Sequence, residues 1–297
     1  MAGMRIGFIG LGALGGAIAT RLQQAGHRLY IWGRTPAKLA PWLETGAELL
    51  ASPATLAAQT DCIVLCVTDT AAVEDVVFGH KGVASGAHAG SILLDHSTIH
   101  PLATRRFHAQ LANACAMHWL DAPVSGGVVG AREGRLVVMA GGDAEILERV
   151  RPLLACYSQR TTWMGASGAG QASKIANQMM IGGNIAVAAE ALNYAANFGV
   201  AAVRLPDALA GGWADSAVLQ HHGRHMAAAD YRNEVNATIM AKDIDIACDL
   251  GRETVSPMPV TALVQQLYRQ LIAHGDADKG QSGLMWLYRQ KPLDDAS

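Results

Sequence analysis

Three glycines near the start of the chain have a spacing that could hold a phosphate group. Gly10, Gly12 and Gly15 form a G-x-G-x-x-G pattern between an apolar run and an apolar, helix-like segment. In that context the first glycine permits a tight turn, the second lets the backbone approach a pyrophosphate, and the third lets helix and strand pack closely. The N–H groups at the helix start add partial positive charge. The pattern predicts a dinucleotide site over Gly10, Leu11, Gly12, Ala13, Leu14 and Gly15, and its alternative is a plain glycine-rich turn.

The residues after the second predicted strand indicate which dinucleotide is bound. In this kind of site an Asp or Glu about 20 residues past the glycines accepts hydrogen bonds from the adenosine ribose of NAD. Here the strand 28–32 is followed by Gly33, Arg34 and Thr35, with Lys38 one turn further and no carboxylate. A guanidinium suits a 2′-phosphate through its charge and its forked donors. We therefore predict NADP rather than NAD, and the alternative is that Arg34 is a solvated loop charge.

A lysine near the start of a long apolar segment could transfer a proton. Lys174 precedes Asn177 by three residues and Gln178 by four, so the three share one helical face. A desolvated lysine can have its pKa brought toward neutrality. It could then donate a proton to a carbonyl oxygen as a hydride arrives, and remove that proton in the reverse direction. The alternative is a surface lysine at a partly exposed helix end.

A second set of polar groups follows the predicted strand 117–121. Ser125 supplies a hydroxyl group, and Gly126 and Gly127 offer backbone N–H groups with no side chain in the way. Open α/β sheets bind ligands outside the carboxyl ends of their strands, and such groups suit a small carboxylate. The alternative is an ordinary turn after a strand.

Composition limits the remaining possibilities. The chain has 297 residues, a formal net charge of −2 and 51% apolar residues. This fits two domains and favours neither a nucleic acid nor a membrane as partner. The five cysteines form no C-x-x-C pair and the start of the chain does not read as a signal peptide, so we expect a cytoplasmic protein. His221, His222 and His225 lie close together but lack metal-ligand spacing, so no metal site is predicted.

The elements that must position these groups change in character along the chain. Short apolar strands alternate with helices up to about residue 164, which predicts an α/β fold with a doubly wound parallel sheet. Strands are expected at 4–9, 28–32, 47–50, 62–67, 91–95, 117–121, 135–140 and 161–164, and helices at 13–24, 37–44, 71–78, 102–113 and 144–154. Further helices are expected at 171–198, 243–248 and 259–273.

We therefore expect an NADP-binding, Rossmann-type domain over residues 1–165 and an all-α domain over residues 166–297. Val67 and Thr68, at the end of the predicted strand 62–67, are further candidate cofactor contacts.

Taken together, the motifs resemble those of the β-hydroxyacid dehydrogenase family, which includes 3-hydroxyisobutyrate dehydrogenase, tartronate semialdehyde reductase and 6-phosphogluconate dehydrogenase. Besides the glycine run, the resemblance rests on 95–99, 121–127, 165–178 and 241–244, in family order and spacing. It implies that Lys174 is the catalytic lysine. The implied substrate contacts are Ser125, Gly126, Gly127, Asn177 and its neighbour Gln178. Thr98 would lie near the nicotinamide end of the cofactor, and Lys242 would reach the cofactor with Asp243 beside it.

The activity that the resemblance implies is NADP-dependent hydride transfer to and from a short β-hydroxy or β-oxo (semialdehyde) carboxylic acid. The Lys-x-x-Asn-Gln order is similar to that of tartronate semialdehyde (2-hydroxy-3-oxopropionate) reductases, whereas Gly33 replaces an Asn common in NADP-using members. The alternatives are 3-hydroxyisobutyrate dehydrogenase or another semialdehyde or glyoxylate reductase, an imine reductase-like enzyme, and a non-catalytic NADP-binding protein. That the second domain binds substrate and mediates oligomerisation is implied by the family resemblance of the motifs. The family usually assembles, so we expect a homodimer or homotetramer through the helical domain.

Overall fold

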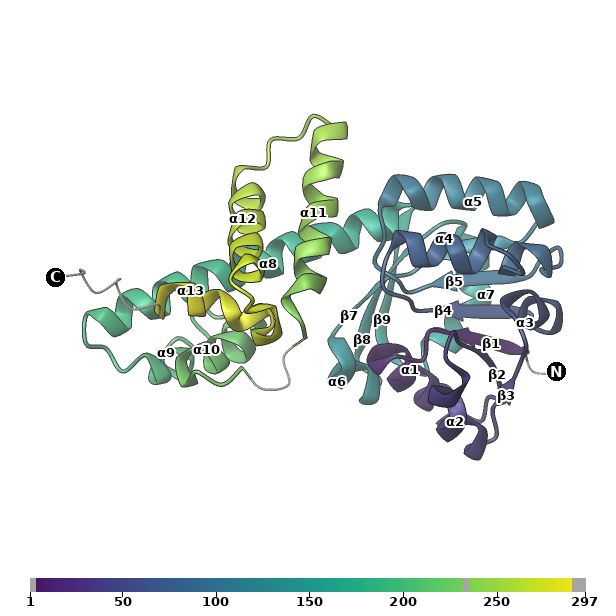
Figure 1. The fold of residues 1–297 in the computed structure, drawn as a ribbon, viewed down its shortest axis with the longest axis horizontal. Helices are drawn as coiled ribbons and strands as arrows, with labels where there is room; N and C mark the ends of the chain where they lie inside the picture. The colour runs from purple at the N-terminus through teal and green to yellow at the C-terminus, as the bar shows by residue number, and fades with distance from the viewer. Residues whose placement is uncertain (1–3, 232–234, 290–297) are drawn as a thin grey trace. The chain divides into compact units, whose positions relative to one another are not determined.

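The computed structural model describes residues 4–231 and 235–289. The described residues divide after Lys174 into two compact units. The first unit contains a sheet with helices on both faces, and the second is built from helices (Figure 1).

In the described residues, nine strands form one sheet in the first unit, in the order β3-β2-β1-β4-β5-β6-β8-β7, with β9 paired to β8. The strands are β1 (Ile6–Ile9), β2 (Leu29–Trp32), β3 (Glu48–Leu49), β4 (Cys62–Leu65), β5 (Ile92–Asp95), β6 (His118–Asp121), β7 (Val124–Ser125), β8 (Leu136–Gly141) and β9 (Ser158–Gly165). β1 lies between β2 and β4, so the strand order reverses beside it. A ligand crevice is expected at such a reversal, outside the carboxyl ends of the strands.

The alternation of side chains along the central strands builds a core on each face of the sheet. Phe8 and Val64 point to one face, where α1 (Ala13–Gln24), α6 (Gly127–Arg132) and α7 (Ala144–Leu154) cover them. Ile9, Ile63 and Leu65 point to the other face. That face is covered by α3 (Pro53–Gln59), α4 (Thr70–Phe78) and α5 (Pro101–Cys115). Both faces are buried, as the continuous apolar runs predict.

The sheet is parallel from β3 to β6, but β8 runs antiparallel to both β6 and β7. The predicted parallel sheet is confirmed from β3 to β6, and the antiparallel pairing of β8 at this edge was not predicted from the sequence. The chain continues from β6 into β7 after Pro123 and returns through the short helix α6. A parallel return needs a longer crossover, usually over a face of the sheet. The predicted helix 37–44 also differs, because it begins as the 3-10 turn η1 (Pro36–Leu39) before α2 (Ala40–Glu44).

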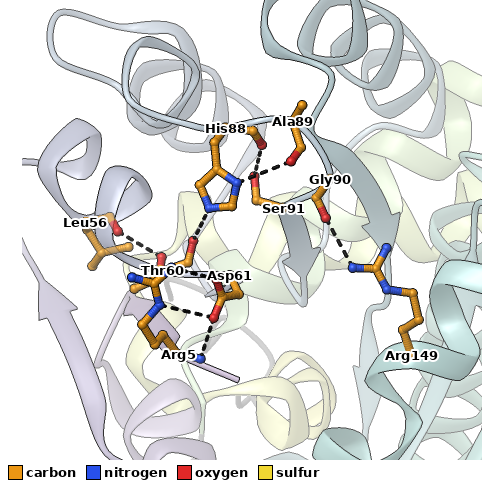
Figure 2. A network of polar contacts seen from close by, with 9 residues as sticks. All are labelled: Arg5, Leu56, Thr60, Asp61, His88, Ala89, Gly90, Ser91 and Arg149. Carbon is orange, nitrogen blue, oxygen red and sulfur yellow. Dashed lines mark hydrogen bonds and ion pairs between the residues drawn. The ribbon is translucent and has the colours of Figure 1, made fainter. Parts of the chain in front are cut away.

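A polar network stabilises the amino ends of the central strands, at the edge of the sheet opposite the carboxyl ends (Figure 2). The Arg5 guanidinium donates to both oxygens of Asp61, at 3.2 and 2.8 Å, and this joins the residues before β1 and β4. The pairing lowers the pKa of the Asp61 carboxyl. His88 contacts the Thr60 carbonyl oxygen at 3.2 Å, next to the start of β5. The network joins strand starts and touches none of the predicted site residues.

The second unit contains no strand among its described residues. Its longest helix, α8 (Ala169–Asn197), begins in the first unit. The other helices and helical turns are η3 (Ala202–Arg204), α9 (Leu205–Ala208), η4 (Leu219–Gly223), α10 (Arg224–Ala228), α11 (Ala237–Glu253), α12 (Pro259–Ala273), η5 (Ala277–Lys279), η6 (Gln281–Met285) and α13 (Trp286–Arg289). Their core gathers around Ile185, Met240, Ile244 and Tyr268. Among the described helices, none has the length and apolarity needed to cross a membrane.

Candidate functional site

The loop after β1 requires glycine at two of its three pattern positions. Gly10 has φ +98°, and a Cβ atom there would lie 2.1 Å from the Cys66 carbonyl oxygen. A Cβ atom on Gly15 would lie 2.0 Å from the Gly10 carbonyl oxygen. The first glycine therefore lets β1 turn against the end of β4, and the third lets α1 fold back onto that turn.

Gly12 differs from its two partners because protein packing does not require it. A Cβ atom built on Gly12 meets no heavy atom within 4 Å, so the space beside it is open. Gly12 is also the residue that precedes α1, whose first turn carries no acidic side chain. An open backbone at a helix start without negative charge fits a pyrophosphate. The residues Gly10 to Gly15 thus fit a dinucleotide at the point where the strand order reverses.

The loop after β2 places positive charge at the surface. Arg34, Thr35 and Lys38 are exposed, and Gly33 before them is half-buried. Arg34 forms no hydrogen bond or ion pair with any residue in the described part of the chain. Its guanidinium donors are therefore available to a ligand phosphate.

The loops after β4 and β5 are tied to each other. The Val67 N–H donates to the Ser97 hydroxyl at 3.0 Å. Thr68 is exposed, and its hydroxyl donates to Asp69, which caps the start of α4. Thr98 is half-buried in the loop that follows β5. Because β4 and β5 are parallel neighbours, both loops lie at the carboxyl edge of the sheet.

A buried histidine, His96, forms hydrogen bonds that hold the β5 loop in place. The two ring nitrogens of His96 contact the Ala122 carbonyl oxygen at 2.5 Å and the Tyr157 hydroxyl at 2.9 Å. Burial lowers the pKa of His96 to about 4, so the ring is neutral near pH 7. A neutral ring with both nitrogens engaged is a structural hydrogen-bonding group that joins the β5 and β6 loops.

The segment after β6 presents the predicted carboxylate-binding turn. Ser125 ends the short strand β7 and is half-buried, and its hydroxyl has no hydrogen-bond partner within the described ranges. Gly126 and Gly127 have φ +121° and +62°, values that favour glycine. A Cβ atom on Gly127 would meet nothing within 4 Å. The turn therefore exposes one hydroxyl and an open stretch of backbone.

Asp121, at the end of β6, anchors the start of α8. Its two carboxylate oxygens accept the N–H groups of Gly168 and Gln171, each at 2.9 Å. Burial raises the pKa of the Asp121 carboxyl, and these hydrogen bonds oppose the rise. Lys174 follows Gln171 by three residues on the same helix and is only 8% exposed. The lysine thus sits about one turn past an anchored helix start.

The remaining predicted residues belong to the second unit and form one polar chain. Asn177 donates to the Gln178 side-chain oxygen at 3.0 Å, and the Gln178 amide donates to Asp243 at 2.6 Å. The Lys242 ammonium lies 3.1 Å from the other Asp243 oxygen. Asp243 is buried, so this carboxylate on α11 holds both Gln178 of α8 and Lys242.

The sequence analysis assigned no role to two residues that organise the site. Asp121 and Gln171 lie inside motifs whose glycines, serine and lysine carried the predictions, whereas His96 is the loop hydrogen-bonding residue that its place beside Thr98 predicts. The signal that could have found them is a polar side chain directly after a buried apolar strand or at a helix start.

The histidine cluster of the second unit is packed and not arranged for a metal. The described residues contain no group of three His, Cys, Asp or Glu side chains that could hold a metal ion. The rings of His221 and His222 meet edge to face, with centroids 4.8 Å apart, and His222 contacts the Ser282 hydroxyl at 2.9 Å. Burial, with the nearby His221 and His225, lowers the pKa of His222 to about 4.

Comparisons with known proteins agree with the two-part sequence pattern. Residues 5–165 match the family described as the NAD binding domain of 6-phosphogluconate dehydrogenase. Residues 168–288 match the family described as NAD-binding of NADP-dependent 3-hydroxyisobutyrate dehydrogenase.

Individual relatives match over nearly their full length. The chain is 36% identical over 282 residues to 2-hydroxy-3-oxopropionate reductase of Escherichia coli (strain K12), covering 95% of this chain and 96% of the relative. It is 34% identical to the probable 3-hydroxyisobutyrate dehydrogenase-like 2, mitochondrial, of Arabidopsis thaliana, covering 96% and 94%. The solved structure of Mycobacterium tuberculosis 3-hydroxyisobutyrate dehydrogenase with L-serine aligns with a TM-score of 0.87 at 28% identity, covering 96% and 99%.

Proposed function

The chain belongs to the β-hydroxyacid dehydrogenase family and is an NAD(P)-dependent dehydrogenase or reductase, and from this premise we propose that it uses NADP to reduce a short β-oxo carboxylic acid. The substrate we propose first is 2-hydroxy-3-oxopropionate. The observation that carries the chemistry is Lys174, a buried lysine one turn past the Asp121-anchored start of α8. The relative at 36% identity and the Lys-x-x-Asn-Gln order support the choice of substrate.

Lys174 acts as the proton donor in this proposal. A bound reduced nicotinamide supplies the hydride to the carbonyl carbon of the substrate. The Lys174 ammonium gives a proton to the carbonyl oxygen as negative charge develops there, and its neutral amine takes the proton back in the reverse reaction. Ser125, Gly126 and Gly127 hold the substrate carboxylate, Asn177 donates a hydrogen bond to the substrate, and Gln178 orients Asn177 through its side-chain oxygen.

Substitution of Lys174 tests the chemistry separately from folding and cofactor binding. We expect Lys174→Ala to lower kcat by about 10²- to 10⁴-fold, the usual contribution of a positioned proton donor. Lys174→Arg should lose activity as well, because a guanidinium keeps the charge but cannot release its proton near pH 7. Both variants should bind NADPH near normally. Retention of most of the activity in either variant would remove Lys174 from the mechanism.

A substrate panel tests the substrate choice. The absorbance of NADPH follows turnover of 2-hydroxy-3-oxopropionate, methylmalonate semialdehyde, succinic semialdehyde and glyoxylate. We expect the highest kcat/KM with 2-hydroxy-3-oxopropionate. The second candidate function is that of a 3-hydroxyisobutyrate dehydrogenase, which the match of residues 168–288 and the Arabidopsis thaliana relative favour. A preference for methylmalonate semialdehyde would select this second function.

The choice of NADP rests on the loop after β2. Arg34 and Lys38 are exposed cations, and no carboxylate is present between Gly33 and Lys38 to repel a 2′-phosphate. We expect Arg34→Ala to lower kcat/KM for NADPH about tenfold or more, because a charge-assisted hydrogen bond is worth about 1.5–3 kcal/mol, and to leave the value for NADH almost unchanged. Arg28→Ala is the matched control, since Arg28 is an exposed arginine paired with Glu48 at the start of β2. A tenfold or greater wild-type preference for NADH would overturn the choice of NADP.

The proposed assembly is a homodimer or homotetramer through the second unit. Along α8 the side chains of Met180, Val187 and Tyr194 are exposed at spacings of seven residues, and Phe198 directly after the helix is exposed as well. A stripe of this kind is typical of a helix that packs against another helix, and its apolar side chains can pack against their own copy in a two-fold contact. We expect Tyr194→Glu to lower the mass measured by light scattering. Leu43→Glu, at an exposed apolar position on α2, should leave the mass unchanged.

The proposed location is the cytoplasm. All five cysteines are free. Burial raises the pKa of Cys62 and of Cys66 to about 12, so neither forms a thiolate readily. Free thiols, without a disulfide, support the proposal that the protein works in a reducing compartment.

A further inference from the structure

We propose that Gln171 is a positioning residue that fixes the loop carrying Thr98 against the helix carrying Lys174. The inference rests on the proposed function, because Thr98 and Lys174 have their roles only there. Gln171 itself touches neither cofactor nor substrate in this proposal. It fixes the distance between Thr98, at the nicotinamide end of the cofactor site, and the proton donor Lys174.

The side chain of Gln171 brackets Thr98 from both sides. Its amide oxygen accepts the Ile99 N–H at 3.1 Å, and its amide nitrogen donates to the Ser97 carbonyl oxygen at 2.7 Å. These two backbone groups flank Thr98 directly. Gln171 is completely buried, so water does not compete for either bond. A planar amide that uses a donor and an acceptor at once fixes both the distance and the orientation of the loop.

The backbone of Gln171 is fixed as well, by a hydrogen bond to the residue that ends β6. Its N–H donates to Asp121 at 2.9 Å, and the second Asp121 oxygen accepts the Gly168 N–H. The loop of Thr98 is joined further to the β4 loop, because Ser97 accepts the Val67 N–H through its hydroxyl. One buried chain of hydrogen bonds therefore links the ends of β4, β5 and β6 with the start of α8.

The position of Gln171 on α8 relates the fixed β5 loop to Lys174. Gln171 and Lys174 are three residues apart, so they occupy neighbouring positions on one face of the helix. A shift of the β5 loop relative to α8 would change the distance between Thr98 and Lys174 without removing either residue. A misplacement of about 1 Å between the groups that hold the reacting atoms can cost about 10²-fold in rate.

The first test compares the affinity of the whole cofactor with that of its adenosine half. Gln171→Met keeps the side-chain volume and removes both hydrogen bonds. Calorimetry then gives Kd for NADPH and for 2′-phospho-ADP-ribose, which lacks the nicotinamide, with NADH and ADP-ribose run in parallel. We expect Gln171→Met to weaken binding of the whole cofactor about tenfold, the effect of about one lost hydrogen bond, and to change the Kd of the fragment less than about twofold. Equal weakening of both ligands, or no change in either, would overturn the proposal.

A double-mutant cycle shows whether Gln171 acts through Thr98. Once the loop has shifted, the Thr98 side chain no longer contributes, so Thr98→Ala should have little further effect in a Gln171→Met background. Additive losses in the double variant would mean that Gln171 is structural only. Gln171→Asn serves as the second variant if Gln171→Met folds poorly. It keeps an uncharged amide that is one methylene shorter, so it cannot hold Ser97 and Ile99 at the same positions, and it should show the same split between cofactor and fragment.

Ser173→Ala is the matched control on the same turn of α8. The Ser173 hydroxyl donates to the Ala169 carbonyl oxygen at 2.8 Å, within the helix. Its removal should leave both dissociation constants unchanged within about twofold, because no loop depends on it. These are binding measurements, so they can succeed or fail whether or not the substrate panel finds turnover.

Discussion

Asp121 and Gln171 in the first unit and Gln178 in the second unit have different kinds of hydrogen-bond partner. In the first unit, Asp121 and Gln171 bond to backbone groups of loops that follow strands. In the second unit, Gln178 bonds to the Asp243 side chain, and His222 contacts the hydroxyl of Ser282. The first arrangement fixes the path of the backbone, whereas the second joins side chains that extend from separate helices.

The secondary structure of each unit explains this difference. Loops at strand ends leave backbone N–H and C=O groups that no neighbouring strand satisfies, so buried side chains must supply partners. Helices satisfy their own backbone except at the ends, so buried polar side chains within helices pair with each other. Removing a partner from a fixed backbone group should therefore destabilise the protein more than removing one from a flexible side chain.

Asp121→Asn should give the largest loss of stability. An asparagine keeps one acceptor oxygen, but its NH2 group faces the second backbone N–H at a buried site, where neither group can reach water. We expect the free energy of unfolding to fall by about 3 kcal/mol, the upper range for a lost charge-assisted hydrogen bond. Hydrogen exchange of the amides at 168–174 measures the local effect.

The control for Asp121→Asn is Asp143→Asn at the exposed start of α7. Asp143 also accepts two backbone N–H groups, those of Glu145 and Ile146, but both reach the same carboxylate oxygen, and an asparagine keeps that oxygen. Asparagine is an equally good capping residue at an exposed position. A loss at Asp143 as large as the loss at Asp121 would mean that the lost charge, and not the lost buried acceptor, is the cause.

Asp243→Asn should destabilise the second unit less, by about 1.5 kcal/mol, within the range for one lost charge-assisted bond. The new side chain can turn its oxygen toward Gln178, and the Lys242 ammonium, which is partly exposed, can move toward water. Hydrogen exchange within α11 reports the change. Asp245→Asn on the same helix is the control, because Asp245 lies nearer the surface, where it pairs with Arg269. If Asp243→Asn proved as damaging as Asp121→Asn, the contrast between the units would disappear.

The sequence predicts those features of the fold that depend on neighbouring residues along the chain. The helices at 13–24, 144–154 and 259–273 have their predicted bounds, because a glycine before the first, Asp143 before the second and Pro259 in the third mark where they start. Fold class and family are confirmed by the comparisons as well. These features depend on residues close together in the sequence.

What the sequence did not predict depends on residues far apart. The Gln171 bonds to Ser97 and Ile99 span 74 and 72 positions, and the bond from Gln178 to Asp243 spans 65. Such pairs are set by the strand order and by helix packing, neither of which has a local signal. The helix predicted at 243–248 extends over Ala237–Glu253 in α11, because its cap at Asn236 lies well before the apolar pattern.

One buried histidine, His96, and one half-buried histidine, His222, should make both units sensitive to acid. Burial lowers the pKa of His96 and of His222 to about 4, below the 6.5 of an exposed histidine. Between about pH 6.5 and pH 4 the unfolded chain therefore binds more protons than the folded chain. Each histidine should lower stability by about 1.4 kcal/mol per pH unit as the pH falls through this window.

Urea denaturation at pH 5 and pH 7 measures the acid effect. We expect His96→Gln and His222→Gln each to reduce the loss of stability between the two pH values. A slope that remained unchanged in either variant would contradict the role of that histidine.

The smallest expected loss of stability comes from removing a helix cap. A cap in each unit shows whether the loss depends on the kind of hydrogen-bond partner or on the unit. The Ser52 hydroxyl accepts the Thr55 N–H at the start of α3 in the first unit, and the Asn236 side chain accepts the Thr238 N–H at the start of α11 in the second. Both caps bond to backbone, so Ser52→Ala and Asn236→Ala should each lower the free energy of unfolding by about 1 kcal/mol. Equal losses would show that the kind of partner, and not the unit, sets the cost of a lost bond. A much smaller loss at Asn236 would instead attribute the contrast to the packing of the second unit as a whole.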